Sequence, residues 1–158
     1  MRIGQSVDRH RLEKGRKLIV GGVEIDHEYG QLGHSDGDAL THAVAEAILG
    51  ALALGDLGKH FPDTDDKWKD INSLKILSEV VKLMDEKGYE IENVDCLIMI
   101  EKPKMAPYIE TIRNNYAEVL HCSIDQISVK ATRGEGLGFV GEEKGVEAHA
   151  VVLLKERG

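Results

Sequence analysis

The chain has 158 residues, of which 20 are lysine or arginine and 28 are aspartate or glutamate, so its formal net charge is −8. An acidic chain lacks the positive field that non-specific binding to nucleic acid needs, so we expect no nucleic-acid partner. Hydrophobic residues make up 42% and charged residues 30% of the sequence, which excludes a disordered or collagen-like chain. This length predicts one domain, over residues 1–158, with a core that needs no disulfides.

Cys96 and Cys122 are too few for a disulfide framework, and neither belongs to a CxxC pair. This cysteine content favours a reducing compartment. No stretch approaches the roughly 18 consecutive apolar residues of a membrane span, and the N-terminus lacks the apolar segment of a signal peptide. We therefore expect no membrane partner and a bacterial cytoplasmic location, although a processed plastid protein would have the same features.

The first third of the chain predicts strands followed by a helix. Residues 2–8 have the pattern of a strand, and residues 18–25 predict a hairpin with a two-glycine turn. From about residue 36 to residue 54 the apolar residues recur at three- and four-residue spacing, which predicts a buried helix. Ser35 or Asp36 is the expected N-cap of this helix.

The remainder alternates between helices and strands. Residues 56–65 form a polar loop long enough to carry function. A second helix is expected from a cap at Ser73 to Gly88, and a third from about Pro107 to Leu120. Further strands are expected at residues 91–100, 127–131 and 146–154.

This order of elements predicts the fold class. Strands interleaved with helices, ending in segments with an antiparallel pattern, favour an α/β architecture of the α+β type. We expect a two-layer sandwich in which the helices cover one face of a mixed sheet of four to five strands.

Three side chains are candidates for a metal site. Asp8 and His10 are two residues apart on a predicted strand, so both point to the same face, and His42 lies on the first predicted helix. If that helix packs on the sheet, the three form an Asp-His-His set with an open position, which suits catalytic zinc. The alternative is a surface carboxylate beside an ordinary strand histidine.

The polar run from His34 to Asp38 directly precedes the helix that carries His42. Its backbone N–H groups and Ser35 are placed where helix starts bind anions. Asp38 lies one helical turn before His42 and is a candidate to orient that ring. The alternative is that the aspartates complement the helix dipole and His34 is a solvated loop residue.

The glycine-rich segment from Thr132 to Gly141 contains a formal GxGxxG pattern. A dinucleotide-binding fingerprint must open a helix within a strand-helix-strand unit, whereas this segment leads into a β-patterned stretch, so that interpretation fails. A phosphate-binding nest and a mobile surface loop both remain open. Glu135 in this segment offers a hard oxygen ligand for magnesium beside a diphosphate.

Pro103 to Pro107 joins a predicted buried strand to a helix. Backbone amides and Lys104 at this junction are positioned to hold a base or a phosphate. The alternative is a rigid connector.

Taken together, these motifs occur in one order along the chain: Asp8-x-His10, His34-Ser35-Asp36-Gly37-Asp38, His42, Gly55-Asp56-Leu57-Gly58, Phe61-Pro62-Asp63-Thr64-Asp65, Pro103-Lys104-Met105, Lys130-Ala131-Thr132 and Glu135-x-Leu137-Gly138-Phe139. In this order and spacing the chain resembles the 2-C-methyl-D-erythritol 2,4-cyclodiphosphate synthase family. The resemblance runs from the first residues to the last strand.

The resemblance implies a homotrimeric phosphorus-oxygen lyase of the non-mevalonate isoprenoid pathway with active sites between subunits. The 2-phosphate of 4-diphosphocytidyl-2-C-methyl-D-erythritol 2-phosphate would attack the β-phosphate and release CMP. By analogy, Asp8, His10 and His42 hold Zn²⁺, and Glu135 helps to hold Mg²⁺ or Mn²⁺ against the diphosphate. Displacement at phosphorus needs positioning and charge neutralisation more than a protein nucleophile, which agrees with this set.

The same resemblance assigns the remaining site positions. His34 and Arg133 are the catalytic candidates, and His34 and Ser35 would bind the substrate phosphates. Asp56 and Gly58 would take methylerythritol hydroxyls, and segments holding cytidine and its phosphates would complete the pocket. The full substrate-binding set implied is Asp8, His10, His34, Ser35, Asp56, Leu57, Gly58, Phe61, Pro62, Asp63, Thr64, Asp65, Ile100, Glu101, Lys102, Pro103, Lys104, Met105, Ala106, Thr132, Arg133, Gly134, Glu135, Phe139 and Glu142.

The chain departs from the family pattern most clearly at Arg133 and Glu142, with milder departures at Gly134, Gln5-Ser6 and Arg9. Arg133 stands where the family usually has a threonine that steadies the transition state, and we expect near-normal turnover with it. Glu142 stands where many relatives have an arginine associated with the central cavity of the trimer, which argues against an isoprenoid diphosphate there. Two other functions compete: a zinc hydrolase of a phosphorylated substrate, and a trimeric nucleotide or isoprenoid diphosphate binder without catalysis.

Overall fold

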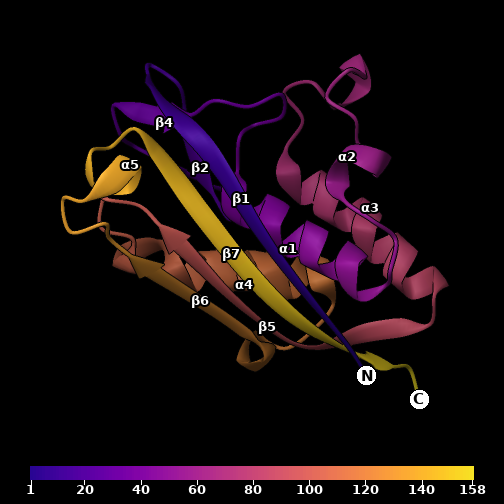
Figure 1. Ribbon diagram of the computed structural model, residues 1–158. Coiled ribbons are helices and arrows are strands. Elements are labelled where there is room, and N and C mark those ends of the chain that lie inside the picture. The colour runs from indigo at the N-terminus through magenta and orange to yellow at the C-terminus, as the bar shows by residue number, and fades with distance from the viewer.

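The computed structural model describes residues 1–158 and has two layers, a twisted sheet and a layer of helices (Figure 1). The main sheet has five strands in the order β4-β1-β7-β5-β6. Neighbouring strands are antiparallel except β5 and β6, which are parallel, so the predicted mixed sheet is confirmed. The strands are β1 (Arg2–Lys14), β4 (Tyr29–Gln31), β5 (Tyr89–Met99), β6 (Ile127–Thr132) and β7 (Gly145–Glu156).

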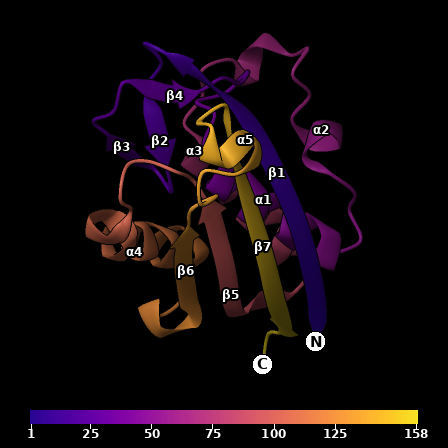
Figure 2. The same cartoon turned by 60° about the vertical axis from the view of Figure 1, so that its left-hand side comes forward.

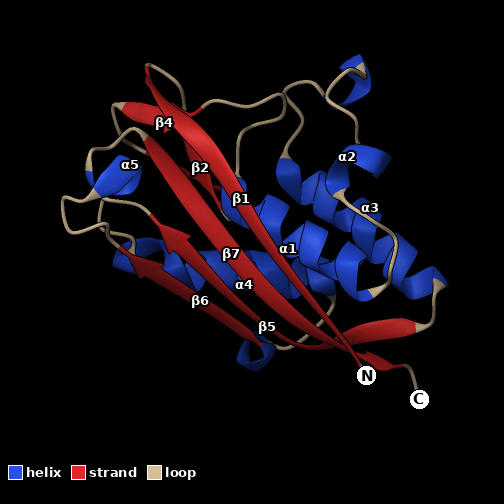
Figure 3. Cartoon of the chain, viewed as in Figure 1, coloured by secondary structure: helices blue, strands red, loops and turns tan.

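Three long helices cover one face of this sheet, as the sequence predicts (Figure 3). They are α1 (Ala39–Ala51), α3 (Ser73–Glu86) and α4 (Ile109–Leu120). The helix α1 packs across β1 and β7. Two helices of one turn, α2 (Leu57–His60) and α5 (Gly138–Gly141), lie within segments expected to be loops, because four residues are too short to carry a helical period.

The predicted hairpin is confirmed as a separate two-stranded sheet of β2 (Leu18–Val20) and β3 (Val23–Ile25). Figure 2 shows this hairpin beside β4. Its turn residues Gly21 and Gly22 have φ angles of 56° and 76°, a left-handed conformation that glycine adopts without strain.

Several predicted boundaries were wrong. The strand expected at residues 2–8 continues to Lys14, where its end pairs with the unpredicted β4. The first helix begins at Ala39 with Asp38 as its N-cap, rather than at Ser35 or Asp36. Likewise Asn72, rather than Ser73, caps α3. In both cases the residue directly before the helix supplies the side-chain oxygen that caps it. The residues that we expected as caps, Ser35, Asp36 and Ser73, make other hydrogen bonds.

The core lies between the sheet and the helices and contains 33 buried hydrophobic residues. On the opposite face of the sheet, which the helices leave uncovered, Ile3, Val7 and Val151 are 71%, 36% and 42% exposed. No helix has the length and apolar character required to cross a membrane.

One close approach fixes the position of α1 over β1. A Cβ atom at Gly4 would lie 1.8 Å from the backbone oxygen of Ala47, so α1 packs against β1 at a distance that excludes any side chain. This packing brings the first turn of α1 over the part of β1 that carries Asp8 and His10.

Candidate active site

Asp8, His10 and His42 converge where α1 crosses β1. Asp8 and His10 lie on the face of β1 that is turned toward the helices, because side chains two apart in a strand share a face. The Oδ2 atom of Asp8 is 2.9 Å from Nε2 of His10 and 3.2 Å from Nδ1 of His42. One ligand atom from each of the three residues lies within 4.8 Å of the others, a spacing that fits a single metal ion.

The electrostatics of the site follow from this packing. Burial raises the pKa of the Asp8 carboxyl, but hydrogen bonds and positive charge from His10 and His42 outweigh it and lower the pKa from 3.8 to about 2. Burial lowers the pKa of His10, and the hydrogen bond and charge of Asp8 outweigh this and raise it above 6.5. Asp8 is therefore a carboxylate at neutral pH, the form that ligates metals.

The donor set fits a transition metal. Two imidazole nitrogens and one carboxylate oxygen are typical ligands of catalytic zinc, which keeps a further position open for water or substrate. The Nδ1 atom of His10 is 2.7 Å from the backbone oxygen of Leu32 and donates to it, which leaves Nε2 as the ligating nitrogen. The side chains of Asp8, His10 and His42 remain 29%, 15% and 12% exposed, so the site is reachable from a cavity.

That cavity has a volume of about 260 Å³. It brings together eight of the residues predicted for metal or substrate binding: Asp8, His10, His34, Ser35, His42, Leu57, Phe61 and Asp63. It is also lined by Glu46 and Ile76, which the sequence analysis missed. Glu46 accepts from the hydroxyl of Ser6 and the backbone N–H of Leu57. The sequence does contain an indication of this role for Glu46, which is an acidic residue one helical turn after His42 in a mostly apolar helix.

A second cavity of about 290 Å³ lies against β5, β6 and the start of α4. It brings together eight more of the predicted substrate-binding residues: Ile100, Glu101, Pro103, Lys104, Met105, Ala106, Thr132 and Arg133. Since β6 is one edge of the sheet and β1 lies next to the other edge, the two cavities lie toward opposite edges of the sheet.

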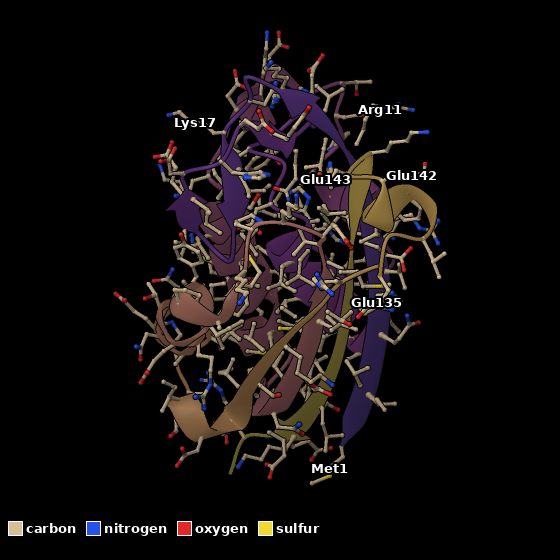
Figure 4. The ribbon with its side chains drawn as sticks, turned by 90° about the vertical axis from the view of Figure 1, so that its left-hand side faces the viewer. Met1, Arg11, Lys17, Glu135, Glu142 and Glu143 are labelled. Carbon is tan, nitrogen blue, oxygen red and sulfur yellow. The ribbon has the colours of Figure 1, made fainter.

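Other predicted site residues line neither of these cavities: Asp56, Gly58, Pro62, Thr64, Asp65, Lys102, Gly134, Glu135, Phe139 and Glu142. Figure 4 shows Glu135 and Glu142 on the segment between β6 and β7. The carboxylate of Glu135 is 3.0 Å from the guanidinium of Arg133, and both side chains are exposed. Phe139 lines a different cavity with Arg9, His10, Arg11 and Lys144.

The role expected for Asp38 was wrong. Asp38 is fully buried and accepts hydrogen bonds from the backbone N–H groups of Gly21, Gly22 and Thr41 and from the Thr41 hydroxyl. It therefore links the hairpin turn to the start of α1. Its backbone oxygen accepts from the backbone N–H of His42 at 3.0 Å, but its carboxylate makes no hydrogen bond with the His42 ring. Its carboxylate caps the start of α1, which agrees with the alternative that this aspartate complements the helix dipole.

The residues that do contact the far side of the His42 ring are Ser35 and Ser73. Their hydroxyl oxygens lie 2.9 Å and 2.8 Å from Nε2 of His42. Ser73 was expected to act as a helix cap, and its place beside the site depends on how α3 packs on α1, which local sequence does not encode.

Comparison with known proteins places this geometry in a family. The model of the YgbB family matches residues 1–155. The 2-C-methyl-D-erythritol 2,4-cyclodiphosphate synthase of Alkaliphilus metalliredigens is 57% identical over 154 residues, which cover 98% of this chain and 97% of that protein. The protein of the same name from Clostridioides difficile is 54% identical, over 98% of this chain and 96% of its own length.

Solved structures agree with the sequence matches. A 2C-methyl-D-erythritol-2,4-cyclodiphosphate synthase in a CDP-bound form superposes with a TM-score of 0.90 at 36% identity, over 98% of this chain and 100% of that one. The bifunctional IspDF of Campylobacter jejuni superposes with a TM-score of 0.94 at 38% identity, and this chain covers 42% of that longer protein. The chain therefore belongs to the YgbB family, that of the 2-C-methyl-D-erythritol 2,4-cyclodiphosphate synthases of the non-mevalonate pathway.

Proposed function

We propose that the protein converts 4-diphosphocytidyl-2-C-methyl-D-erythritol 2-phosphate into 2-C-methyl-D-erythritol 2,4-cyclodiphosphate and CMP. The substrate's own 2-phosphate attacks its β-phosphate, and the bond between the β-phosphate and CMP breaks. The observation that carries this proposal is the convergence of Asp8, His10 and His42 beside a cavity lined by His34 and Ser35. Such a site binds a diphosphate, and the attacking group is a phosphate of the substrate rather than a protein side chain.

The chain's own groups position the two phosphates. The Ser35 hydroxyl accepts from the His42 ring and keeps its own hydrogen for a phosphate oxygen. The ring of His34, whose Nε2 is 3.1 Å from the backbone oxygen of Asp65, lines the same cavity and binds the phosphate. Asp56 and Gly58 bind methylerythritol hydroxyls. Holding both reacting phosphates in one cavity makes the attack effectively unimolecular, and lost geometry alone costs about 100-fold in rate.

Two metal ions complete the proposed site. Asp8, His10 and His42 hold Zn²⁺, and Glu135 holds Mg²⁺ or Mn²⁺ together with the substrate diphosphate. When bound, these ions supply Lewis-acid charge neutralisation on the phosphate oxygens. The exposed guanidinium of Arg133, 3.0 Å from the Glu135 carboxylate, competes with this second ion for Glu135.

The second cavity suits the cytidine end of the substrate. Six of its eleven lining residues are hydrophobic, among them Ile100, Met105 and Ala106, which can contact a base, and Lys104 offers a charge for phosphate. Eight of its eleven lining residues come from two segments of the predicted substrate-binding set: Ile100, Glu101, Pro103, Lys104, Met105 and Ala106 from one, and Thr132 and Arg133 from the other. The binding of CDP by structural relatives supports this assignment.

We infer a homotrimer with its active sites between subunits. In one chain the predicted substrate-binding residues are divided between two separate cavities, which lie toward opposite edges of the sheet. If the β6 side of one copy adjoins the β1 side of the next, the two half-sites join. The uncovered sheet face with exposed Ile3, Val7 and Val151 supplies the apolar surface that such an assembly buries.

Product analysis tests this function. The protein is incubated with the diphosphocytidyl substrate, zinc and magnesium in water labelled with oxygen-18, and the masses of the products are measured by mass spectrometry. Intramolecular attack yields equal amounts of CMP and an unlabelled cyclic diphosphate. A linear product carrying the label would instead identify a zinc hydrolase, and binding without any product would identify a non-catalytic binder.

A further inference from the structure

The ring of His42 is held at both of its nitrogens by different partners. Its Nδ1 faces the Asp8 carboxylate, and its Nε2 faces the hydroxyl oxygens of Ser73 and Ser35 at 2.8 Å and 2.9 Å. Ser73 has no exposed surface and comes from the first turn of α3. Three separate elements thus meet at one imidazole.

Asp36 determines which way the hydrogen of Ser73 points. The Ser73 hydroxyl donates to one oxygen of the Asp36 carboxylate, and the Ser73 backbone N–H donates to the other at 2.9 Å. The backbone N–H of Asp38 also donates to Asp36, at 3.1 Å. A carboxylate only accepts, so the single hydrogen of the Ser73 hydroxyl is committed to Asp36.

This commitment fixes the proton of His42. Because its hydrogen is already used, the Ser73 oxygen can only accept from Nε2 of His42, and Nε2 therefore carries the ring proton. The lone pair of a neutral His42 then lies on Nδ1, the nitrogen that faces Asp8. In His10 the two nitrogens have the opposite roles: Nδ1 carries the proton and donates to the backbone oxygen of Leu32, and Nε2 faces Asp8.

We propose that Asp36 and Ser73 form a positioning relay that holds His42 with its proton on Nε2 and its Nδ1 aimed at the metal. Neither residue touches the metal or the substrate. They act through His42 alone, as the carboxylates behind metal-ligating histidines do elsewhere. The relay also connects α3 to the metal centre, so the packing of α3 on α1 sets the angle of the His42 ring. This inference rests on the metal site of the proposed function.

The first measurement is which His42 nitrogen binds zinc. In the zinc-loaded protein labelled with nitrogen-15 in histidine, long-range proton–nitrogen spectra distinguish a metal-bound nitrogen from one that carries a proton. We expect His42 to bind through Nδ1 and His10 through Nε2, with the His42 resonances assigned by their loss in His42→Gln. Zinc bound through Nε2 of His42 would overturn the relay.

The second measurement is zinc affinity, by competition with a chelator. Ser73→Ala should weaken zinc binding about 10- to 100-fold while the circular dichroism spectrum stays unchanged, because a helix start accepts alanine. Asp36→Asn should weaken it less, since the amide oxygen still accepts. Ser78→Ala on the same helix is the matched control, because the Ser78 hydroxyl is exposed and bonds only the backbone oxygen of Lys75.

The outcomes separate this relay from the function itself. Zinc affinity of Ser73→Ala equal to that of Ser78→Ala would overturn the relay and leave the metal site intact. Failure of the unaltered protein to bind zinc would instead contradict the proposed function together with the relay. If Ser73→Ala failed to fold, the nitrogen assignment in the unaltered protein would still decide the proposal.

Discussion

The Nδ1 atom of His42 lies 3.2 Å from the Oδ2 atom of Asp8, although 34 residues separate them along the chain. Their proximity is a product of tertiary packing, since one comes from α1 and the other from β1. The contact at Gly4, where α1 touches the backbone of β1, sets the distance between the two elements. The candidate metal site therefore depends on packing several residues away from it.

His42→Ala should remove the zinc and abolish CMP release while the protein stays folded. We expect a loss of at least about 100-fold in turnover, because a site reduced to two ligands no longer holds the metal or the phosphate geometry. Elemental analysis and a CMP assay check this. His121→Asn is the control, since His121 is exposed at the end of α4 with a φ of 56° that asparagine tolerates. Full activity of His42→Ala without zinc would contradict the assignment.

Gly4→Ala should destabilise the protein by about 1–3 kcal/mol or more, because the added Cβ would overlap the backbone oxygen of Ala47 and push α1 away from β1. Gly50→Ala in α1 is the matched control: nothing lies within 4 Å of its added Cβ. That change should be neutral or stabilising by about 0.5–1 kcal/mol. Urea unfolding of the two variants measures the difference, and equal stabilities would refute the close-packing argument.

Arg133→Thr should lower the magnesium concentration needed for half-maximal turnover. The Arg133 guanidinium is 3.0 Å from the Glu135 carboxylate and competes with a cation for it. Both side chains are exposed, so the pair is worth at most about 1 kcal/mol, which corresponds to about a fivefold shift. Turnover at saturating magnesium should stay close to that of the unaltered protein. Lys82→Thr, which removes the exposed pair with Glu79 on α3, is the control.

A much larger gain would contradict this expectation. If Arg133→Thr released CMP orders of magnitude faster than the unaltered protein, Arg133 would be a block in the site.

If the protein is the trimer that we propose, Val151→Asp should convert it into monomers. Val151 is 42% exposed on the uncovered face of the sheet, and burying an unpaired charge there would cost more than the assembly gains. Light scattering gives the mass directly. Ser78→Asp, on the outer side of α3, adds the same charge away from this face and should leave the trimer unchanged. An unaltered protein that scatters as a monomer would refute the inferred assembly.

Much of the fold is predictable from the sequence because its elements have strong local patterns. The hairpin around Gly21 and the strands β5 and β7 follow from glycine turn chemistry and apolar runs. In contrast, β4 has three residues with a central glycine and no alternating pattern, and it forms because the end of β1 offers it a partner. An element such as β4, which forms only because a distant strand pairs with it, has no local pattern from which it could be predicted.

The residues of the site likewise fall into those that the sequence could predict and those that it could not. Asp8, His10 and His42 carry their chemistry in their residue types and spacing, so they could be proposed from the sequence. The contacts of Asp38 and Ser73 could not, because the choice between capping a helix and orienting a ring is made by the packing of the hairpin and of α3. The short helix α5 near Glu135 was likewise below the length at which periodicity is detectable.

Anomalous diffraction at the zinc edge, from crystals grown with zinc and CDP, locates the metal directly. We expect one zinc ion bound by the Asp8 carboxylate, His10 and His42, with a phosphate oxygen of the nucleotide beside it. Zinc found at other residues, or these three side chains turned apart with the diphosphate bound elsewhere, would contradict it.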